Sequence, residues 1–259
     1  MSRLGYKVAI VTGDAQGFGA AAAEALALEG ATVLITGAEG EAFALGLRER
    51  GLKAEYHQLD TSNPLSWAAL VDTIMRTHGH LDVLVNQAGA NVSITIEDAT
   101  AAQLREVLEA DLIGPFLGTK AVIAAMRQSG GGSIINIAAN PIVEILPLYA
   151  LYGAAKAALL NLTKTTAVHS IQRGYDIRVN AVHPGAHETQ LLTDNAIRST
   201  TARNVSTLLG TLPVRATGTL YEFADAITYL AADESQHITG TEIFCNGVLT
   251  DLAQAAQSG

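Results

Sequence analysis

The sequence predicts an α/β fold: a doubly wound parallel sheet with helices on both faces, forming one domain over residues 1–259. Short runs rich in β-branched residues alternate with longer alanine- and leucine-rich segments of helical period, as expected for buried parallel strands joined by crossover helices. No internal repeat or linker interrupts this alternation. A chain of 259 residues that is 49% hydrophobic can also bury one large core.

Seven short apolar runs bounded by polar or glycine positions are the predicted strands. They are Lys7–Val11, Thr32–Thr36, Ala54–Leu59, Val83–Asn86, Ser133–Ala138, Ile177–Val182 and Glu242–Cys245. The segments between them have apolar residues at helical spacing. The predicted helices are Gly17–Glu29, Glu41–Arg50, Pro64–Thr77, Ala101–Gln128, Leu148–Arg173 and Leu220–Ala232.

The polar stretch over residues 184–214 fits neither pattern. It follows the sixth strand at the end where open α/β sheets bind their ligands, so we interpret it as a substrate lid. A plain surface insertion is the alternative.

Composition excludes several classes of function. A formal charge of -9 without any basic run argues against a nucleic-acid surface. Cys245 is the single cysteine, so no intrachain disulfide can form, which fits a reducing compartment. The apolar start Val8–Val11 runs directly into Gly13 without a cleavage site, and the apolar stretch 145–162 contains a proline and Lys156. We therefore expect a cytoplasmic protein that binds neither nucleic acid nor membrane.

A glycine-rich turn follows the first predicted strand. Thr12-Gly13-Asp14-Ala15-Gln16-Gly17-Phe18-Gly19 links that strand to an alanine-rich helix. Glycines let the backbone approach a pyrophosphate, whose charge is stabilised at the helix N-terminus. Glycines also serve ordinary tight turns, but strand, turn and helix in this order predict a nucleotide site.

A tyrosine and a lysine lie four residues apart in Tyr152-Gly153-Ala154-Ala155-Lys156. Residues four apart share one face of a helix, so the phenol and the ammonium can point into one site. The cation can then stabilise a phenolate and make Tyr152 a usable proton donor or acceptor near neutral pH. An ordinary amphipathic pair is the alternative reading of Tyr152 and Lys156.

These segments together resemble the classical short-chain dehydrogenase/reductase family over nearly the whole chain. Thr12, Gly13, Gly17 and Gly19 fit its TGxxxGxG motif, Asn86-Gln87-Ala88-Gly89 resembles its NNAG segment, and Tyr152 with Lys156 fits its YxxxK pair. Asn180, Pro184, Gly185 and Thr189 fit RVNAVxPGxxxT, and Thr239-Gly240 with Asn246-Gly247 resembles its closing strand. The resemblance implies a Rossmann-type fold that binds NAD or NADP.

The resemblance also implies which residues form the cofactor site. The cofactor-binding positions are Gly13, Gln16, Phe18, Gly19, Gly37, Asp60, Asn86, Ala88, Gly89, Tyr152, Lys156, Pro184, Gly185 and Thr189. Several of these also have ordinary structural readings. Asp60 suits a strand-end cap, Asn180 a satisfied polar group and Pro184-Gly185 a turn. No metal ligand set is predicted.

Two positions depart from the family's catalytic pattern. The family has a substrate-binding serine thirteen residues before the tyrosine, where this chain has Ala139. Its catalytic asparagine aligns with Asp111, whose carboxylate would favour a charged Lys156 but offset part of the pull of that lysine on the tyrosine proton. Losing one oxyanion donor lowers rates by about two to three orders of magnitude, which leaves slow turnover. Asn140 and Ser93 are candidate substitute donors, with surface polar residues as the alternative.

The implied reaction is hydride transfer between C4 of a nicotinamide and a carbonyl or secondary alcohol carbon. Tyr152 would pass the proton, Lys156 would hold the nicotinamide ribose, and Asp111 or its backbone would connect a water chain to solvent. Ile142, Val143, Ile145 and Leu146 follow the fifth strand and favour an apolar or cyclic substrate. The alternatives are a catalytically silent relative that acts by nucleotide binding or assembly, and a non-redox isomerase or lyase.

The choice of dinucleotide depends on the end of the second strand. An acid there selects NAD and a nearby arginine selects NADP. This chain continues as Gly37-Ala38-Glu39 and has neither residue at the two deciding positions. Glu39, Glu41 and Asp14 would repel a 2′-phosphate, so the prediction leans to NAD. The family commonly forms tetramers through its long helices, and small-residue faces around 121–125 and 154–158 would permit a homotetramer.

Overall fold

The computed structural model describes residues 2–87, 89, 92–139, 147–184 and 219–245. The lid predicted over 184–214, beyond Pro184, lies outside the described residues. The same is true of the predicted substrate wall at Ile142, Val143, Ile145 and Leu146.

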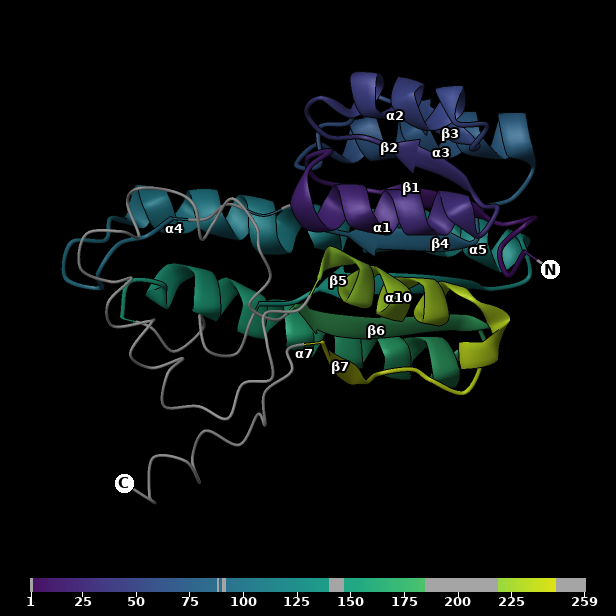
Figure 1. Ribbon diagram of the computed structural model, residues 1–259. Helices are drawn as coiled ribbons and strands as arrows, with labels where there is room; N and C mark the ends of the chain where they lie inside the picture. Colours follow the sequence, from purple (N-terminus) through teal and green to yellow (C-terminus); the bar gives the residue numbers. More distant parts are fainter. Residues whose placement is uncertain (1, 88, 90–91, 140–146, 185–218, 246–259) are drawn as a thin grey trace, which may run out of the picture.

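A seven-stranded parallel sheet forms the centre of the molecule and confirms the predicted fold class (Figure 1). Its strands are β1 (Val8–Val11), β2 (Thr32–Ile35), β3 (Ala54–Tyr56), β4 (Val83–Asn86), β5 (Gly132–Ile137), β6 (Ile177–Pro184) and β7 (Glu242–Cys245). Their order is β3-β2-β1-β4-β5-β6-β7. The chain therefore builds outwards from β1 in one direction and then from β4 in the other, which makes the β1/β4 boundary the switch point of the topology.

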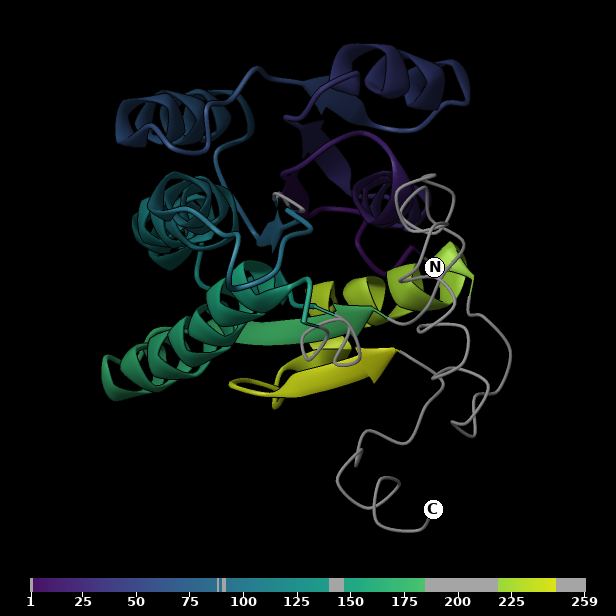
Figure 2. The same ribbon diagram turned by 90° about the vertical axis from the view of Figure 1, so that its left-hand side faces the viewer.

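Helices cover both faces of the sheet in two layers (Figure 2). One layer holds α1 (Gly17–Leu28), α2 (Gly40–Glu49) and α10 (Leu220–Ala231), and the other holds α3 (Pro64–His78), α5 (Gly114–Gln128) and α7 (Ala150–Gln172). Alternate strand residues feed the two cores: Ala9 and Val11 face the α1 side, whereas Val8 and Ile10 face the α3 side. Apolar residues on both faces explain why the strands are continuous hydrophobic runs.

The long helix predicted over Ala101–Gln128 is wrong in one respect, because three segments take its place. They are α4 (Ala101–Leu108), a π-helical turn η1 (Glu109–Ile113) and α5. Within the turn, the Gly114 amide donates to the Glu109 carbonyl five residues back. Pro115 has no amide hydrogen for the carbonyl of Asp111, so the ordinary i→i−4 ladder is interrupted at this point.

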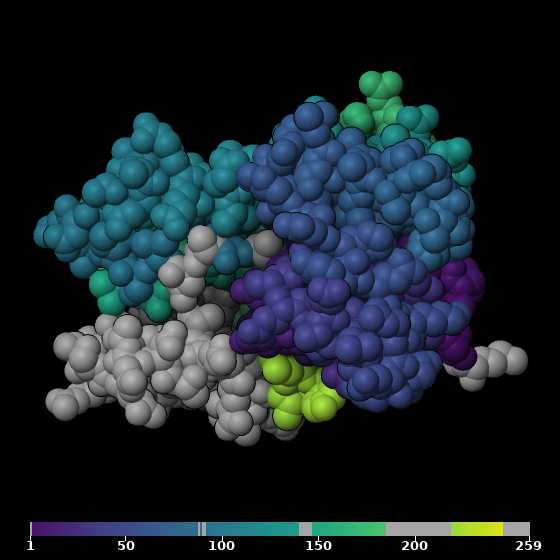
Figure 3. Space-filling view, turned by 90° about the horizontal axis from the view of Figure 1, so that it is seen from above, coloured from purple at the N-terminus to yellow at the C-terminus, as the bar shows by residue number. Residues whose placement is uncertain are grey.

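A small third hydrophobic cluster joins α4 to the start of α7. Val107, Leu151 and Ala155 are its buried members. Seen from above, the α4 region (teal) forms a lobe to one side of the body that carries α2 and α3 (blue) (Figure 3). A short 3-10 turn, η2 (Asp233–Ser235), follows α10. No helix in the described ranges is both long enough and apolar enough to cross a membrane.

Candidate functional site

The site residues predicted from the sequence gather at the carboxyl ends of the central strands. The glycine-rich turn follows β1, Gly89 follows β4, and Ala139 follows β5. In doubly wound sheets this edge, at the switch point between β1 and β4, is the place where ligands bind.

The glycine-rich turn is shaped for a close approach by a ligand. Gly13 (φ 92°) and Gly17 (φ 54°) have left-handed backbone conformations that disfavour other residues. A Cβ added at Gly17 would meet no atom within 4 Å, so open space lies above the backbone there. Gln16 precedes α1 and its side chain does not cap the helix, which leaves the first-turn amides available for an anion. The turn fits a dinucleotide pyrophosphate.

The turn after β2 supports the glycine-rich turn from the side. A Cβ on Gly37 would lie 1.7 Å from the carbonyl oxygen of Gly13, so only glycine fits at position 37. The Ala15 amide donates to the Ala38 carbonyl at 3.1 Å. Gln16 Nε2 donates to Glu39 Oε2 at 2.6 Å, and both side chains are exposed at the mouth of the turn. Gly37 therefore acts through packing, while Gln16 and Glu39 present polar groups to solvent.

Phe18 and Gly19 begin α1 and lie against different neighbours. The Phe18 ring packs edge-on against Phe223 of α10, with ring centroids 4.7 Å apart. A Cβ on Gly19 would lie 2.6 Å from Gln87 Oε1 and 2.7 Å from the Asp14 carbonyl oxygen. Gly19 thus permits α1 to lie close to the segment after β4, which holds the helix N-terminus over the crevice.

Tyr152 and Lys156 lie on one face of α7, as their spacing predicts. The Lys156 ammonium lies 5.5 Å from the centroid of the Tyr152 ring. Lys156 Nζ also donates to the Ile137 carbonyl at 3.1 Å and forms an ion pair of 2.9 Å with Asp111 Oδ1. Since Lys156 is 3% exposed and Asp111 0%, the pair is shielded from solvent.

Gly89 lies directly against this ion pair. A Cβ at Gly89 would lie 2.5 Å from Asp111 Oδ1 and 3.6 Å from Lys156 Nζ. Asp111 itself projects from the π-helical turn η1, whose wider winding turns its side chain inward. The structure thus brings together Gly89, Asp111, Tyr152 and Lys156, which come from three separate segments.

Ala139 lies two residues beyond the end of β5 and is fully buried. Its carbonyl oxygen is 2.8 Å from Nδ1 of His183, the penultimate residue of β6. Pro184 ends β6 and is buried as well. Ser93, a candidate substitute donor, is exposed. Asn140, the other candidate, lies outside the described residues, as do the predicted cofactor positions Ala88, Gly185 and Thr189 and the closing-strand pair Asn246-Gly247.

Three polar residues of the family motifs have side chains bonded within the fold. Asn86 Nδ2 donates to Asn136 Oδ1 at 2.8 Å beneath the crevice. Asn180 donates to the Ile238 carbonyl at 2.8 Å and accepts from the Thr241 amide, which ties β6 to the segment before β7. Asp60 accepts from the amide and hydroxyl of Ser62 ahead of α3, as a turn-forming residue does. The contacts of Asn180 match its alternative reading as a satisfied polar group, whereas Asp60 lies four residues beyond the end of β3 and so does not cap that strand.

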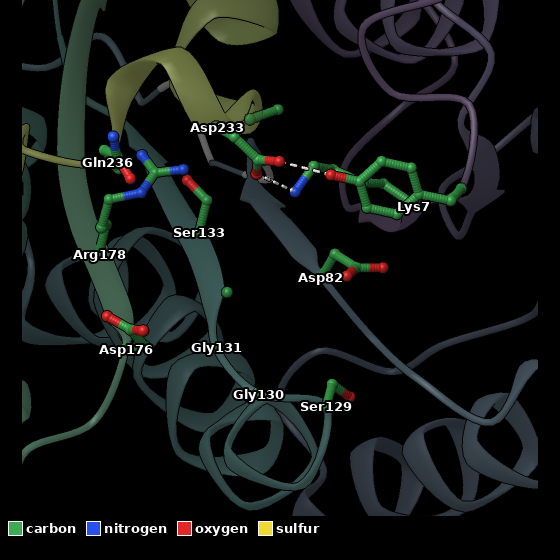
Figure 4. A pocket seen from close by; sticks show the side chains of 13 residues that line it. Lys7, Asp82, Ser129, Gly130, Gly131, Ser133, Asp176, Arg178, Asp233 and Gln236 are labelled. Atoms are coloured by element: carbon green, nitrogen blue, oxygen red, sulfur yellow. Dashed lines mark hydrogen bonds and ion pairs between the residues drawn. The ribbon is translucent and has the colours of Figure 1, made fainter.

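A second, polar cavity of about 290 Å³ lies at the opposite, amino-terminal edge of the sheet (Figure 4). Its two cations already have partners. Lys7 Nζ is 2.7 Å from Asp233 Oδ1, and Arg178 donates to the Leu230 carbonyl and to Ser235 Oγ behind α10. Burial lowers the pKa of Arg178, against smaller opposing effects. This cavity is therefore a structural junction and lacks a free cation for a phosphate among its lining residues.

Two polar side chains near the site did not stand out in the sequence. His183 and Glu242 are 59 positions apart, and only the β6–β7 pairing brings them within 2.9 Å. The one local signal was a histidine immediately before the Pro184-Gly185 turn. Within the described ranges, no group of three His, Cys, Asp or Glu side chains is arranged to hold a metal ion.

Comparison with known proteins agrees with this geometry. The family model described as enoyl-(acyl carrier protein) reductase matches residues 13–250. The 3-alpha-(or 20-beta)-hydroxysteroid dehydrogenase of Mycobacterium tuberculosis is 39% identical, over 95% of this chain and 90% of the relative. The NADP-dependent (R)-specific alcohol dehydrogenase of Lentilactobacillus kefiri is 34% identical, over 96% and 98%. The cyclopentanol dehydrogenase of Comamonas testosteroni is 34% identical, over 96% and 99%.

A solved structure shares the fold at similar coverage. The crystal structure of a candidate gluconate dehydrogenase from Agrobacterium tumefaciens superposes with a TM-score of 0.86 at 26% identity, over 96% of this chain and 98% of that one. The family model and the relatives both cover more than nine-tenths of the chain. The protein therefore belongs to the short-chain dehydrogenase/reductase family of oxidoreductases.

Proposed function

We propose that this protein interconverts a ketone and a secondary alcohol by hydride transfer with NAD or NADP, with Tyr152 as the proton donor or acceptor. The observation that carries the proposal is the Tyr152–Lys156 pair, which lies on one helix face beside a glycine turn shaped for a pyrophosphate. The nicotinamide supplies the hydride, and all the other tasks belong to residues of this chain.

Each residue of the pair has a distinct task in this proposal. The Tyr152 hydroxyl gives a proton to the ketone oxygen in reduction and takes it back in oxidation. Lys156 places its positive charge near the phenol and stabilises the phenolate. The Lys156 ammonium has three N–H donors. The contacts with the Ile137 carbonyl and Asp111 use two of them, and the third would hold a ribose hydroxyl of the cofactor.

The substrate class is part of the same proposal. The relatives named above act on hydroxysteroids and cyclopentanol, and a relative from Sinomonas cyclohexanicum is a trans-4-hydroxycyclohexanecarboxylate dehydrogenase. We propose a cyclic or otherwise apolar alcohol for this chain. Because Ala139 has no hydroxyl for the substrate oxygen, we expect turnover about two to three orders of magnitude below that of an Ala139→Ser variant.

The cofactor preference leans to NAD, since the exposed turn after β2 presents Glu39 and no cation. One relative is named as NADP-dependent, so the preference has to be measured. Parallel calorimetric titrations with NADH and NADPH decide it. Binding of NADPH tighter than NADH would overturn the lean without touching the oxidoreductase proposal.

Replacing Tyr152 with phenylalanine tests the reaction itself. We expect cofactor affinity to stay within about twofold and oxidation of cyclopentanol to fall by at least a hundredfold, because general acid–base catalysis contributes about two to four orders of magnitude. Full activity in Tyr152→Phe would refute the proposal.

A catalytically silent protein is the second candidate. The alanine at position 139 and the buried carboxylate at 111 favour it, because both change groups that the family uses in chemistry. If neither reduced cofactor binds in the titrations, this candidate replaces the first. Turnover that does not depend on added nicotinamide would instead indicate isomerisation or elimination.

We also propose a homotetramer assembled through α5 and α7. Their surfaces carry exposed Phe116, Val168 and Ile171, apolar side chains that assembly would cover. Light scattering at micromolar concentration measures the mass, and a monomer would contradict this proposal.

A further inference from the structure

His183 of β6 is buried between the end of β5 and strand β7, and each of its ring nitrogens faces an oxygen atom. Its exposure is 2%. Nδ1 lies 2.8 Å from the carbonyl oxygen of Ala139 after β5, and Nε2 lies 2.9 Å from Glu242 Oε2 on β7. The imidazole ring stacks on Phe244 of β7, with centroids 4.3 Å apart and planes at 13°.

The neighbours of the ring determine which groups can accept a hydrogen bond from it. A backbone carbonyl can only accept, so Nδ1 must carry a proton. Glu242 also accepts from Lys164 Nζ at 2.6 Å. Partial burial raises the pKa of Glu242, but the hydrogen bonds from Lys164 and His183 outweigh it and hold that pKa below its usual value. Nε2 faces a carboxylate oxygen of Glu242, so each ring nitrogen of His183 faces a hydrogen-bond acceptor.

The Glu242 carboxylate lies between two basic side chains. It faces the ring of His183 from β7, Lys164 of α7 reaches its other oxygen, and the segment after β5 contributes the Ala139 carbonyl. The result is a chain of contacts from β5 through β6 and β7 to α7, the helix that carries Tyr152. Buried polar groups are hydrogen-bonded in folded proteins, and both ring nitrogens of His183 have partners.

Two basic side chains, Lys156 and His183, bind successive carbonyls at and after the end of β5. Lys156 Nζ binds the carbonyl of Ile137, the Ala138 amide donates to Val182 at 2.9 Å, and His183 binds the carbonyl of Ala139 two residues later. A shift of the strand end would move the Ile137 carbonyl and with it the Lys156 ammonium. Because His183 is 2% exposed, we expect its influence on the reaction to pass through this strand.

We propose that His183 is a positioning residue: through hydrogen bonds from its two ring nitrogens to Ala139 and Glu242, it fixes the end of β5 and thereby the Lys156 ammonium beside Tyr152. This inference rests on the proposed oxidoreductase function. A purely structural role would make the two contacts of His183 interchangeable. The positioning role predicts that the reaction rate depends on the contact with Ala139 and not on the contact with Glu242.

Two amide substitutions separate the contacts. In His183→Asn the side-chain NH2 takes the place of Nδ1 and keeps the donor to Ala139. In His183→Gln the NH2 takes the place of Nε2 and keeps the donor to Glu242. His183→Leu removes both donors and serves as the reference. Oxidation of cyclopentanol with the preferred cofactor gives kcat and KM, and thermal unfolding reports the stability of each variant.

We expect His183→Leu to lower kcat by about ten- to a hundredfold, since small displacements of catalytic groups have effects of this size. His183→Asn should restore most of that loss, His183→Gln should not, and the KM for cofactor should change less than kcat in all three. Equal kcat in the Asn and Gln variants, at equal stability, would overturn the positioning role.

An independent readout does not require activity. In ¹⁵N-labelled wild-type protein at neutral pH, both ring nitrogens of His183 should carry protons, and Glu242→Gln should reduce the ring to one. A singly protonated wild-type ring would show that His183 does not donate to both Ala139 and Glu242, and would overturn the proposed bridge whether or not the protein turns over substrate. A doubly protonated ring in a protein that neither binds cofactor nor oxidises cyclopentanol would overturn the proposed function, and the positioning role with it.

Discussion

Replacing Asp111 with asparagine removes one charge from the buried ion pair and leaves the shape of the site almost unchanged. The Lys156–Asp111 distance is 2.9 Å, and the two side chains are 4% and 0% exposed. At an effective dielectric constant of about 20, opposite unit charges at this distance attract by about 6 kcal/mol. Most of this attraction offsets the cost of desolvating the two ions, so the net contribution of the pair to the free energy of unfolding is much smaller.

The asparagine variant leaves Lys156 buried without its counterion. Removing one partner of a buried pair lowers the free energy of unfolding by about 3–5 kcal/mol, and the amide oxygen still accepts a hydrogen bond, so we expect about 3 kcal/mol. For a domain of this size that lowers Tm by about 6–12 °C. Thermal and urea unfolding measure it.

A surface pair provides the matched control. Asp72 and Arg76 form an ion pair of 3.1 Å on α3 with both side chains 70% exposed. Asp72→Asn should change the free energy of unfolding by less than about 0.5 kcal/mol. If Asp111→Asn is as stable as Asp72→Asn, the buried pair contributes nothing and our reasoning about its burial is refuted.

The same substitution should also change the pH dependence of the reaction. Without the carboxylate, the whole charge of Lys156 acts on Tyr152 and stabilises its phenolate. We expect the rise of the oxidation rate with pH to move to lower pH in Asp111→Asn. A shift to higher pH would contradict this electrostatic account.

Three further predictions concern other parts of the molecule. Gly37→Ala would push a methyl group into the glycine-rich turn, so NADH binding measured by calorimetry should weaken at least about tenfold. The control is Gly46→Ala, in open space within α2, which should raise the free energy of unfolding by up to about 1 kcal/mol. Asp233 has a pKa below its usual value, held there mainly by the hydrogen bond from Lys7. The ionised carboxylate therefore contributes its full stabilisation at neutral pH, and this contribution is lost as the pH falls through the lowered pKa. In Asp233→Asn, the free energy of unfolding measured against pH should fall less steeply at acid pH than in the wild type. Burial raises the pKa of the Cys245 thiol to about 11, so iodoacetamide should alkylate native protein at pH 7 ~100-fold more slowly than unfolded protein, and equal rates would show the thiol to be freely ionising.

The strands were predicted to within a few residues because each is buried on both faces and is therefore a continuous apolar run. The main error in strand length is β3, which ends at Tyr56 rather than Leu59, since its pairing with β2 stops there. The break at η1 was not predicted. A five-residue π-turn changes the helical period too little to alter the hydrophobic pattern, although Gly114 and Pro115 mark the place.

The candidate site was predicted where local motifs encode it. The spacing of Tyr152 and Lys156 and the order of strand, turn and helix both depend on neighbours in sequence. The His183 contacts depend instead on strand order, which places β5, β6 and β7 side by side. The reason for a glycine at Gly37 was equally hidden, because the atom that excludes a side chain belongs to a turn 24 positions earlier.

The π-helical turn also determines how far α4 is rotated about the helix axis relative to α5. On one side α5 is packed into the sheet core, and on the other α4 forms part of the lobe beside the crevice. Because each residue of an α-helix advances by about 100°, deleting one residue from Glu109–Ile113 would rotate α4 by roughly that angle while α5 stayed in place. The outer wall of the crevice could then be remodelled, in evolution or by design, without repacking the core.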